Sequence, residues 1–263
     1  MRIKITLTSE EKINLPKSYN HILQGFIYEH ILDPVLRKLL HNRGFIYEKR
    51  KFKFFTFSRL LGKFNSLGEE FQFTSPVDLI ISSPKNEILQ NLVEGFFKKD
   101  KILLGKNEVF IESISLMPRI SFDNEVIIKM LSPLTVYSTL QKSDGSKKTY
   151  YYSPFEEEFN KLIKENLKKK YEACFLEKPN NFDFEISPFK VRPQDEKIII
   201  YDKKSKYQSK PTVIKAWMGL YKLKGNPDLI QLSYDCGLGS KNSLGFGCWE
   251  VVEYEERQEN KNE

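Results

Sequence analysis

The 263-residue chain has few of the residues that build metal sites and disulfide frameworks. It contains three cysteines (Cys174, Cys236 and Cys248) and three histidines, and no two cysteines have the CxxC spacing of a zinc site. An odd and widely spaced set of cysteines also argues against a disulfide framework. These scarcities predict a reduced, cytoplasmic protein without a structural zinc site or a histidine-rich metal site.

Long apolar runs and an excess of acidic residues are missing as well. No apolar run approaches the ~18 residues that a membrane-spanning helix needs, and residues 1–8 alternate like a strand, unlike a signal peptide. The chain has 42 Lys and Arg against 35 Asp and Glu, so its formal charge of +7 excludes an acidic solvating protein. Aromatic residues make up 13% of the chain, which argues against disorder. We therefore expect a folded protein with a polyanionic partner and no membrane partner.

The hydrophobic pattern predicts the same order of elements twice. In the first half we expect strands at 2–8, 53–59, 71–74, 77–82 and 109–117, with helices at 19–41 and 86–99. In the second half we expect strands at 126–131, 182–186, 212–223 and 246–253, with helices at 154–176 and 227–236. Asp33 and Pro34 divide the first helix, because Asp caps helices and Pro begins them.

Both halves fit the βαββαβ order of a ferredoxin-like, or RRM-like, domain. The predicted fold class is therefore α+β with two tandem ferredoxin-like domains. The first covers residues 1–120 and the second covers residues 121–252. A flexible acidic tail is expected at residues 253–263, because this segment has no apolar period.

Positive charge is concentrated in one stretch of the first half. Residues 37–63 contain nine Lys or Arg and one Glu, so this stretch is more positive than the whole chain. Residues 202–224 contain seven lysines and one Asp, and residues 161–170 contain five lysines and one Glu. For residues 161–170, a solvated helix face and a contact with a polyanion are equally good interpretations. The 37–63 stretch is the main candidate for binding a polyanion.

Aromatic residues alternate with the basic ones in that stretch. Basic side chains bind phosphates while rings stack on bases, a combination typical of binding to single-stranded nucleic acid. The alternative is that the rings face the core of a strand. In a regular strand Phe54 and Phe55 cannot both do so, because adjacent residues point to opposite faces. The rings concerned are Phe45, Tyr47, Phe52, Phe54, Phe55 and Phe57.

Four of the 13 glycines lie in the eleven residues Gly237–Gly247. This segment does not match the dinucleotide pattern GxGxxG, which needs glycine in place of Asn242, nor the spacing of a P-loop. Glycine lets a backbone approach a phosphate closely, so the segment can present N–H groups together with Lys241, Asn242 and Ser243. A simple turn needs fewer glycines, and the segment therefore predicts phosphate binding.

The glycine segment resembles the signature of a known family. Lys241–Gly247, near the end of a double ferredoxin-like chain, is similar to the glycine loop of the CRISPR-associated repeat-processing endoribonucleases, the sixth Cas family of the RAMP superfamily. Tyr19–Tyr28, Leu39–His41 and Lys53–Ser58 look like the first helix and second strand of that family, in the right order. The resemblance extends over residues 2–252.

The resemblance implies cleavage of the repeats in a CRISPR precursor transcript without a metal or another cofactor. A ribose 2′-OH attacks the neighbouring phosphate and leaves a 2′,3′-cyclic phosphate and a 5′-OH end. This reaction needs a base, an acid and positive charge near the phosphorane. The implied partner is CRISPR repeat RNA, as precursor and as mature guide. Other Cas proteins of an effector complex and a second copy of the chain are further candidate partners.

His41 is the candidate for proton transfer, because an imidazole with a pKa of about 6.5 accepts or donates a proton at neutral pH. Lys53 aligns with a family lysine that would stabilise the phosphorane, and Lys51 is the alternative if the strand register differs. Tyr28 aligns with a tyrosine of some members. Its ordinary pKa of about 10 suits positioning or proton donation. His21 is a reserve candidate.

One departure from the family pattern is the long connection between His41 and Lys53. Its extra basic residues either grip RNA or displace Lys53 from the site. Two other functions compete: a non-catalytic RNA-binding RAMP subunit, and a generic RRM module, whose Lys/Arg-Gly-aromatic signature is absent. The predicted RNA contacts are Lys49, Arg50, Lys51, Arg59, Gly237, Gly239, Lys241, Asn242, Ser243, Gly245 and Gly247.

Overall fold

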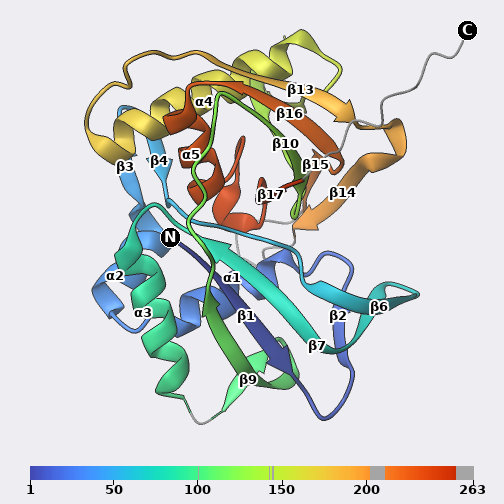
Figure 1. Ribbon diagram of the computed structural model, residues 1–263. Coiled ribbons are helices and arrows are strands. Elements are labelled where there is room, and N and C mark those ends of the chain that lie inside the picture. Colours follow the sequence, from blue (N-terminus) through green and yellow to red (C-terminus); the bar gives the residue numbers. More distant parts are fainter. Residues whose placement is uncertain (100, 142, 144, 202–210, 253–263) are drawn as a thin grey trace, which may run out of the picture.

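The computed structural model describes the chain except for residues 100, 142, 144, 202–210 and 253–263 (Figure 1). The predicted acidic tail lies outside the described residues, as does much of the lysine-rich stretch at 202–224. The described chain forms two units, one from each half of the sequence, and each unit packs helices against an antiparallel sheet. Among the helices of the described residues, none is long and apolar enough to cross a membrane.

The first half forms the predicted ferredoxin-like fold. Its core elements are β1 (Arg2–Thr8), α1 (Asn20–His30), β5 (Thr56–Phe57), β6 (Leu61–Leu67), β7 (Glu70–Ser82), α3 (Asn86–Phe97) and β9 (Asn107–Leu116). Strand β1 lies between β7 and β9, and β5 and β6 pair with β7, all antiparallel. The edges carry β2 (Ile13–Pro16) on β7 and β8 (Ile102–Leu104) on β9. Alternate residues Ile3, Ile5 and Leu7 of β1 point into one core with residues of α1 and α3.

The second half repeats this arrangement. Its core elements are β10 (Glu125–Met130), α4 (Glu157–Phe175), β13 (Phe184–Lys190), β16 (Leu220–Gly225), α5 (Pro227–Cys236) and β17 (Trp249–Val251). The strands lie in the order β13-β16-β10-β17, which is the ferredoxin-like order read from the other edge. Phe159, Ile163 and Leu167, spaced along one face of α4, fill the second core. The prediction of two tandem ferredoxin-like folds is confirmed.

The expected helix at 19–41 is divided into three pieces. Helix α1 ends at His30, and the side chain of Asp33 then accepts a hydrogen bond from the N–H of Val35 at 2.8 Å. This cap begins α2 (Pro34–Lys38), as Asp33 and Pro34 predict. A π-helical turn, Leu39–Arg43, follows directly and carries His41. The division brings His41 back towards the last turn of α1.

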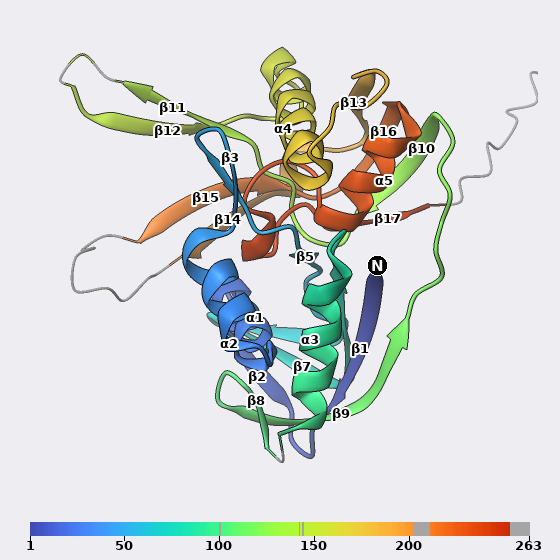
Figure 2. The same cartoon turned by 90° about the vertical axis from the view of Figure 1, so that its left-hand side faces the viewer.

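Three hairpins extend beyond the double fold. They are β3 (Phe45–Tyr47) with β4 (Arg50–Phe52), β11 (Tyr137–Gln141) with β12 (Lys147–Tyr151), and β14 (Glu196–Tyr201) with β15 (Thr212–Trp217). Figure 2 shows the last two projecting on the same side of the molecule. The sequence predicted one strand over 212–223, but Met218 and Gly219 separate β15 from β16. The predicted strand at 53–59 is reduced to Thr56–Phe57.

The aromatic rings of the basic stretch fill cores, so the prediction that they stack on bases is wrong for four of them. Phe52 and Phe54 belong to the second core, whereas Phe55 and Phe57 belong to the first. Phe54 has a positive φ of 49°, which breaks the alternation of a regular strand and lets neighbouring rings enter different cores. Phe45 packs against both cores while only partly buried. These rings therefore anchor the basic stretch to the cores of both domains.

Candidate functional site

Three predicted catalytic residues lie together although they come from three separate elements. Tyr28 is in the last turn of α1, His41 is in the π-helical turn, and Lys53 follows β4. The Lys53 ammonium donates hydrogen bonds to the Tyr28 hydroxyl at 3.0 Å and to the His41 carbonyl at 2.9 Å. The rings of Tyr28 and His41 are 5.4 Å apart between centroids. The geometry places an imidazole, a phenol and an ammonium around one point, and these three predicted catalytic residues are called the catalytic cluster below.

The imidazole of His41 is exposed, and its orientation is fixed by a neighbour. Its Nδ1 lies 2.8 Å from the side-chain oxygen of Asn42. An amide oxygen only accepts hydrogen bonds, so in the tautomer that donates from Nδ1 to Asn42 the basic nitrogen is Nε2. His41 can therefore exchange a proton with a bound molecule through Nε2.

Tyr28 is suited to donating a hydrogen bond rather than acting as a base. Its side chain is buried, and this burial raises the pKa of the phenol well above its usual value. The charge of Tyr201 raises that pKa further, whereas a hydrogen bond with the Ser243 side chain lowers it. Ser243 belongs to the glycine segment, which therefore reaches the catalytic cluster.

The long connection before Lys53 does not displace this residue from the cluster. Residues 45–52 fold into the β3–β4 hairpin, which packs against α4 of the second domain. The Tyr47 hydroxyl donates to Glu172 of α4 at 2.9 Å. Because Phe52 and Phe54 on either side of Lys53 are buried in the second core, the backbone at Lys53 is held from both sides. The alternative residue, Lys51, is exposed.

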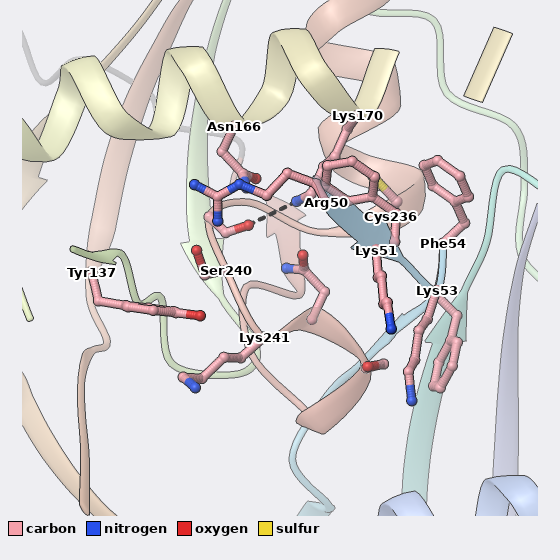
Figure 3. A pocket seen from close by; sticks show the side chains of 15 residues that line it. Arg50, Lys51, Lys53, Phe54, Tyr137, Asn166, Lys170, Cys236, Ser240 and Lys241 are labelled. Carbon is pink, nitrogen blue, oxygen red and sulfur yellow. Dashed lines mark hydrogen bonds between the residues drawn. The ribbon is translucent and has the colours of Figure 1, made fainter. Parts of the chain in front are cut away.

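A basic pocket of about 160 Å³ opens between the β3–β4 hairpin, the glycine segment and α4 (Figure 3). Five cationic side chains line it: Arg50, Lys51, Lys53, Lys170 and Lys241. Asn166, Tyr137, Ser240, Asn242 and Ser243 add polar groups to the lining. A second, open cleft of about 390 Å³ is lined by Tyr28, Arg37, Lys38 and His41 among others. The catalytic cluster therefore joins two basic cavities, because Lys53 lines the first and its neighbours line the second.

The glycine segment is a tightly folded loop. All four of its glycines have positive φ, and they are Gly237, Gly239, Gly245 and Gly247. A Cβ at Gly247 would lie 2.0 Å from the Leu238 carbonyl oxygen, so only glycine fits there. The Asn242 side chain donates to the carbonyls of Leu238 and Phe246 at 2.8 and 3.0 Å. Asn242 therefore closes the loop from inside, while it also lines the basic pocket.

Both domains hold this loop through residues that the sequence did not single out. From α1, Asn20 donates to the carbonyls of Leu244 and Gly245, and Gln24 donates to the carbonyl of Ser243. From α4, Lys170 donates to two further carbonyls of the loop. Asn20, Gln24 and Tyr28 follow one another at intervals of four residues. That spacing places polar groups on one face of a helix and was the available signal.

The remaining predicted residues lie outside the catalytic cluster. Lys49 is exposed in the turn between β3 and β4. Arg59 donates to the Tyr19 hydroxyl at 3.2 Å, its guanidinium lies over the rings of Tyr19 and Phe71, and it does not line the basic pocket. The reserve candidate, His21, has its Nδ1 3.0 Å from the Ser18 carbonyl. His41 is therefore the histidine that the geometry favours.

Comparison with known proteins identifies the family. The model described as "CRISPR associated protein Cas6, C-terminal" matches residues 116–251, and "CRISPR-associated protein Cas6, N-terminal" matches residues 14–115. The chain is 36% identical to "CRISPR-associated endoribonuclease Cas6 1" of Methanocaldococcus jannaschii, over 99% of this chain and 96% of that protein.

Solved structures agree in fold. One titled "CRISPR associated protein Cas6" has 33% identity and a TM-score of 0.76, and covers 96% of this chain and 99% of that one. Another, titled "Characterization of a Cas6-related gene from Pyrococcus furiosus", has 24% identity and a TM-score of 0.82, with coverage of 97% and 99%. The chain belongs to the Cas6 family of CRISPR-associated endoribonucleases.

Proposed function

We propose that the chain cuts the repeats of a CRISPR precursor transcript, without a metal, by attack of a ribose 2′-OH on the adjacent phosphate. The observation that carries the proposal is the meeting of Tyr28, His41 and Lys53 around one exposed point between two basic cavities. This set supplies a group that moves protons at neutral pH and two hydrogen-bond donors, one of them cationic. Such groups satisfy what the reaction needs.

In the proposed reaction, the 2′-oxygen forms a bond to phosphorus while the bond from phosphorus to the 5′-oxygen breaks. His41 takes the proton from the 2′-OH through Nε2 or supplies the proton to the departing 5′-oxygen. Lys53 stabilises the negative charge on the phosphorane, and Tyr28 positions the phosphate or donates a proton. The products are a 2′,3′-cyclic phosphate and a 5′-OH end.

The proposed RNA surface combines the basic pocket with the glycine loop. Lys49, Arg50 and Lys51 of the hairpin and Lys241 of the loop supply cations for phosphates. Ser243 links the loop to Tyr28, so RNA bound along the loop would enter the catalytic cluster. The four glycines of the loop, Asn242 and Arg59 remain predicted contacts with RNA. The proposed place of action is the cytoplasm, and other Cas proteins and a second copy of the chain stay predicted partners.

The competing proposal is a RAMP subunit that holds repeat or guide RNA without cutting it. The catalytic cluster favours the endoribonuclease, because a subunit that only binds RNA needs no histidine with a fixed basic nitrogen. The deciding experiment incubates the protein with its repeat RNA in excess EDTA, beside an RNA with a single 2′-deoxy sugar at the scissile position. Cleavage of the first RNA alone is expected. A requirement for magnesium, or cleavage of the deoxy RNA, would contradict the mechanism, and binding without cleavage would favour the competing proposal.

A further inference from the structure

Lys170 is a buried cation of α4 that contacts the glycine loop. Its side chain is 3% exposed, and its ammonium donates to the Gly237 carbonyl at 2.7 Å and to the Gly239 carbonyl at 2.8 Å. The residue lies in the lysine run 161–170 of α4, where a solvated face was one of two predictions. That prediction is wrong for Lys170. Figure 3 shows this side chain at the wall of the basic pocket.

No carboxylate balances this charge. Among the described residues, Lys170 takes part in no ion pair within 4.0 Å. The titratable groups that share the pocket with it are Arg50, Lys51, Lys53, Tyr137, Cys236 and Lys241. Burial raises the pKa of the Cys236 thiol to about 12, so this group is neutral at physiological pH. A buried and unbalanced ammonium is costly, and it persists here because two carbonyls solvate it.

The two hydrogen bonds determine which atoms the loop offers to the pocket. Carbonyl oxygens repel phosphate oxygens, and Lys170 binds two loop carbonyls on the side of α4. Asn242, Asn20 and Gln24 bind five others. The Lys241 side chain remains directed along the pocket wall, where its ammonium lies 4.6 Å from the centre of the Tyr137 ring. The loop therefore presents cationic and hydroxyl groups to the pocket while its carbonyls are occupied.

We propose that Lys170 is a positioning residue that holds the glycine loop in its RNA-binding conformation, so that its loss weakens RNA binding more than it slows cleavage. The inference rests on the proposed RNA site. Lys170 touches the loop, whereas its described hydrogen bonds do not involve Tyr28, His41 or Lys53. Cleavage of bound RNA should therefore survive its replacement.

The test compares Lys170→Met with Lys168→Met, an exposed lysine of the same helix whose ammonium lies over the Phe182 ring. Both variants remove one charge and keep an unbranched side chain. Binding is measured with a repeat RNA carrying 2′-deoxyribose at the scissile position, and cleavage is measured in single turnovers at saturating RNA. We expect K170M to raise Kd by about tenfold, which corresponds to about 1.4 kcal/mol, with a change in the cleavage rate of less than about threefold. Equal Kd values for K170M and K168M would overturn the inference.

A second measurement on the wild-type protein applies if K170M does not fold. Lysine side-chain NMR follows the titration of Lys170 with and without the 2′-deoxy repeat RNA. Lys170 lines the pocket, so phosphate bound there should stabilise its ammonium and raise its pKa, whereas identical titrations in both samples would show that RNA does not occupy the pocket beside Lys170. The outcomes separate the two proposals. A wild type that cannot cut the repeat removes the proposed function, while a wild type that cuts the repeat but has an RNA-insensitive Lys170 removes this inference alone.

Discussion

The two halves of the molecule share one fold but hold their functional groups in opposite ways. In the first half, His41 is exposed on a short π-helical turn and meets Tyr28 and Lys53 at the surface. In the second half, the glycine loop is largely buried, and its carbonyls are held by its own Asn242, by the buried Lys170 of α4 and by Asn20 of α1. The difference suggests a division of labour. A proton-transfer group must remain accessible, whereas a surface that fits a polyanion must be rigid before the polyanion arrives.

The largest expected effect comes from removing the proton-transfer group of the first half. His41→Ala should lower the single-turnover cleavage rate by about 10²-fold or more, because a general acid–base group contributes about that much. The Kd for RNA should stay nearly unchanged, since the five cationic side chains of the basic pocket remain. His21→Ala is the matched control on α1. Unchanged turnover in H41A would transfer the role to His21 or Tyr28.

Gly247→Ala tests the rigidity of the second half. An added Cβ would collide with the Leu238 carbonyl, so we expect a loss of about 2 kcal/mol in the free energy of unfolding and weaker RNA binding. Gly68→Ala is the control, because Gly68 also has a positive φ but nothing lies within 4 Å of its Cβ position. It should cost only about 1 kcal/mol and leave RNA binding intact. Urea denaturation and RNA titrations measure both, and equal losses would show that the loop is not tightly held.

Removing the charges of the β3–β4 hairpin tests whether RNA binds where the two halves meet. Replacing Lys49, Arg50 and Lys51 together by Ala should raise the RNA Kd by about tenfold. The slope of log Kd against log salt concentration should also become shallower, by up to about 0.7 for each phosphate that the variant no longer neutralises. The control removes three exposed lysines at the end of α3 and beyond it, Lys98, Lys99 and Lys101. Salt titrations of Kd provide the slopes. An unaltered slope would show that the hairpin does not bind RNA.

The last prediction concerns the stability of the second half as pH changes, an effect that appears only in alkaline solution. Burial lowers the pKa of Lys170 to about 8, whereas a lysine in an unfolded chain has a pKa of about 10.4. Between those values the folded protein has released a proton that the unfolded chain still binds, so the free energy of unfolding rises with pH. The wild type should gain stability over K170M in that window, by at most about 1.4 kcal/mol per pH unit. Urea denaturation measures the free energy of unfolding of both proteins at each pH. If the two values changed with pH in parallel, Lys170 would not be a buried ammonium with a lowered pKa.

Sequence periodicity was sufficient for the double fold, because each core strand and helix has its own apolar pattern. Local rules also located the Asp33 cap and the helix that it begins. The conformation of Phe54 could not be predicted by such local rules. Its left-handed backbone depends on contacts with a core from the other half of the chain, and no pattern of neighbouring residues reports that.

The same limit applies to the candidate site. Resemblance to a family predicted His41, Tyr28 and Lys53, and the structure brings these residues together. Lys170 was hidden in a run of five lysines, because its burial depends on the path of the glycine loop rather than on its neighbours in sequence. The spacing of Asn20 and Gln24 indicates a polar helix face, but it does not identify their partners, which lie more than 200 residues away.

The most direct test of the division of labour compares His41→Ala with Lys241→Ala. Single-turnover cleavage is followed over a range of enzyme concentrations, which yields a maximal rate and an apparent Kd for each variant. The account predicts that H41A loses the maximal rate and keeps its Kd. It predicts that K241A keeps the maximal rate and binds RNA several-fold more weakly, since one cation for a phosphate is removed. If both variants lose the same parameter, or if K241A alone lowers the maximal rate, the proposed separation of chemistry from RNA holding is contradicted.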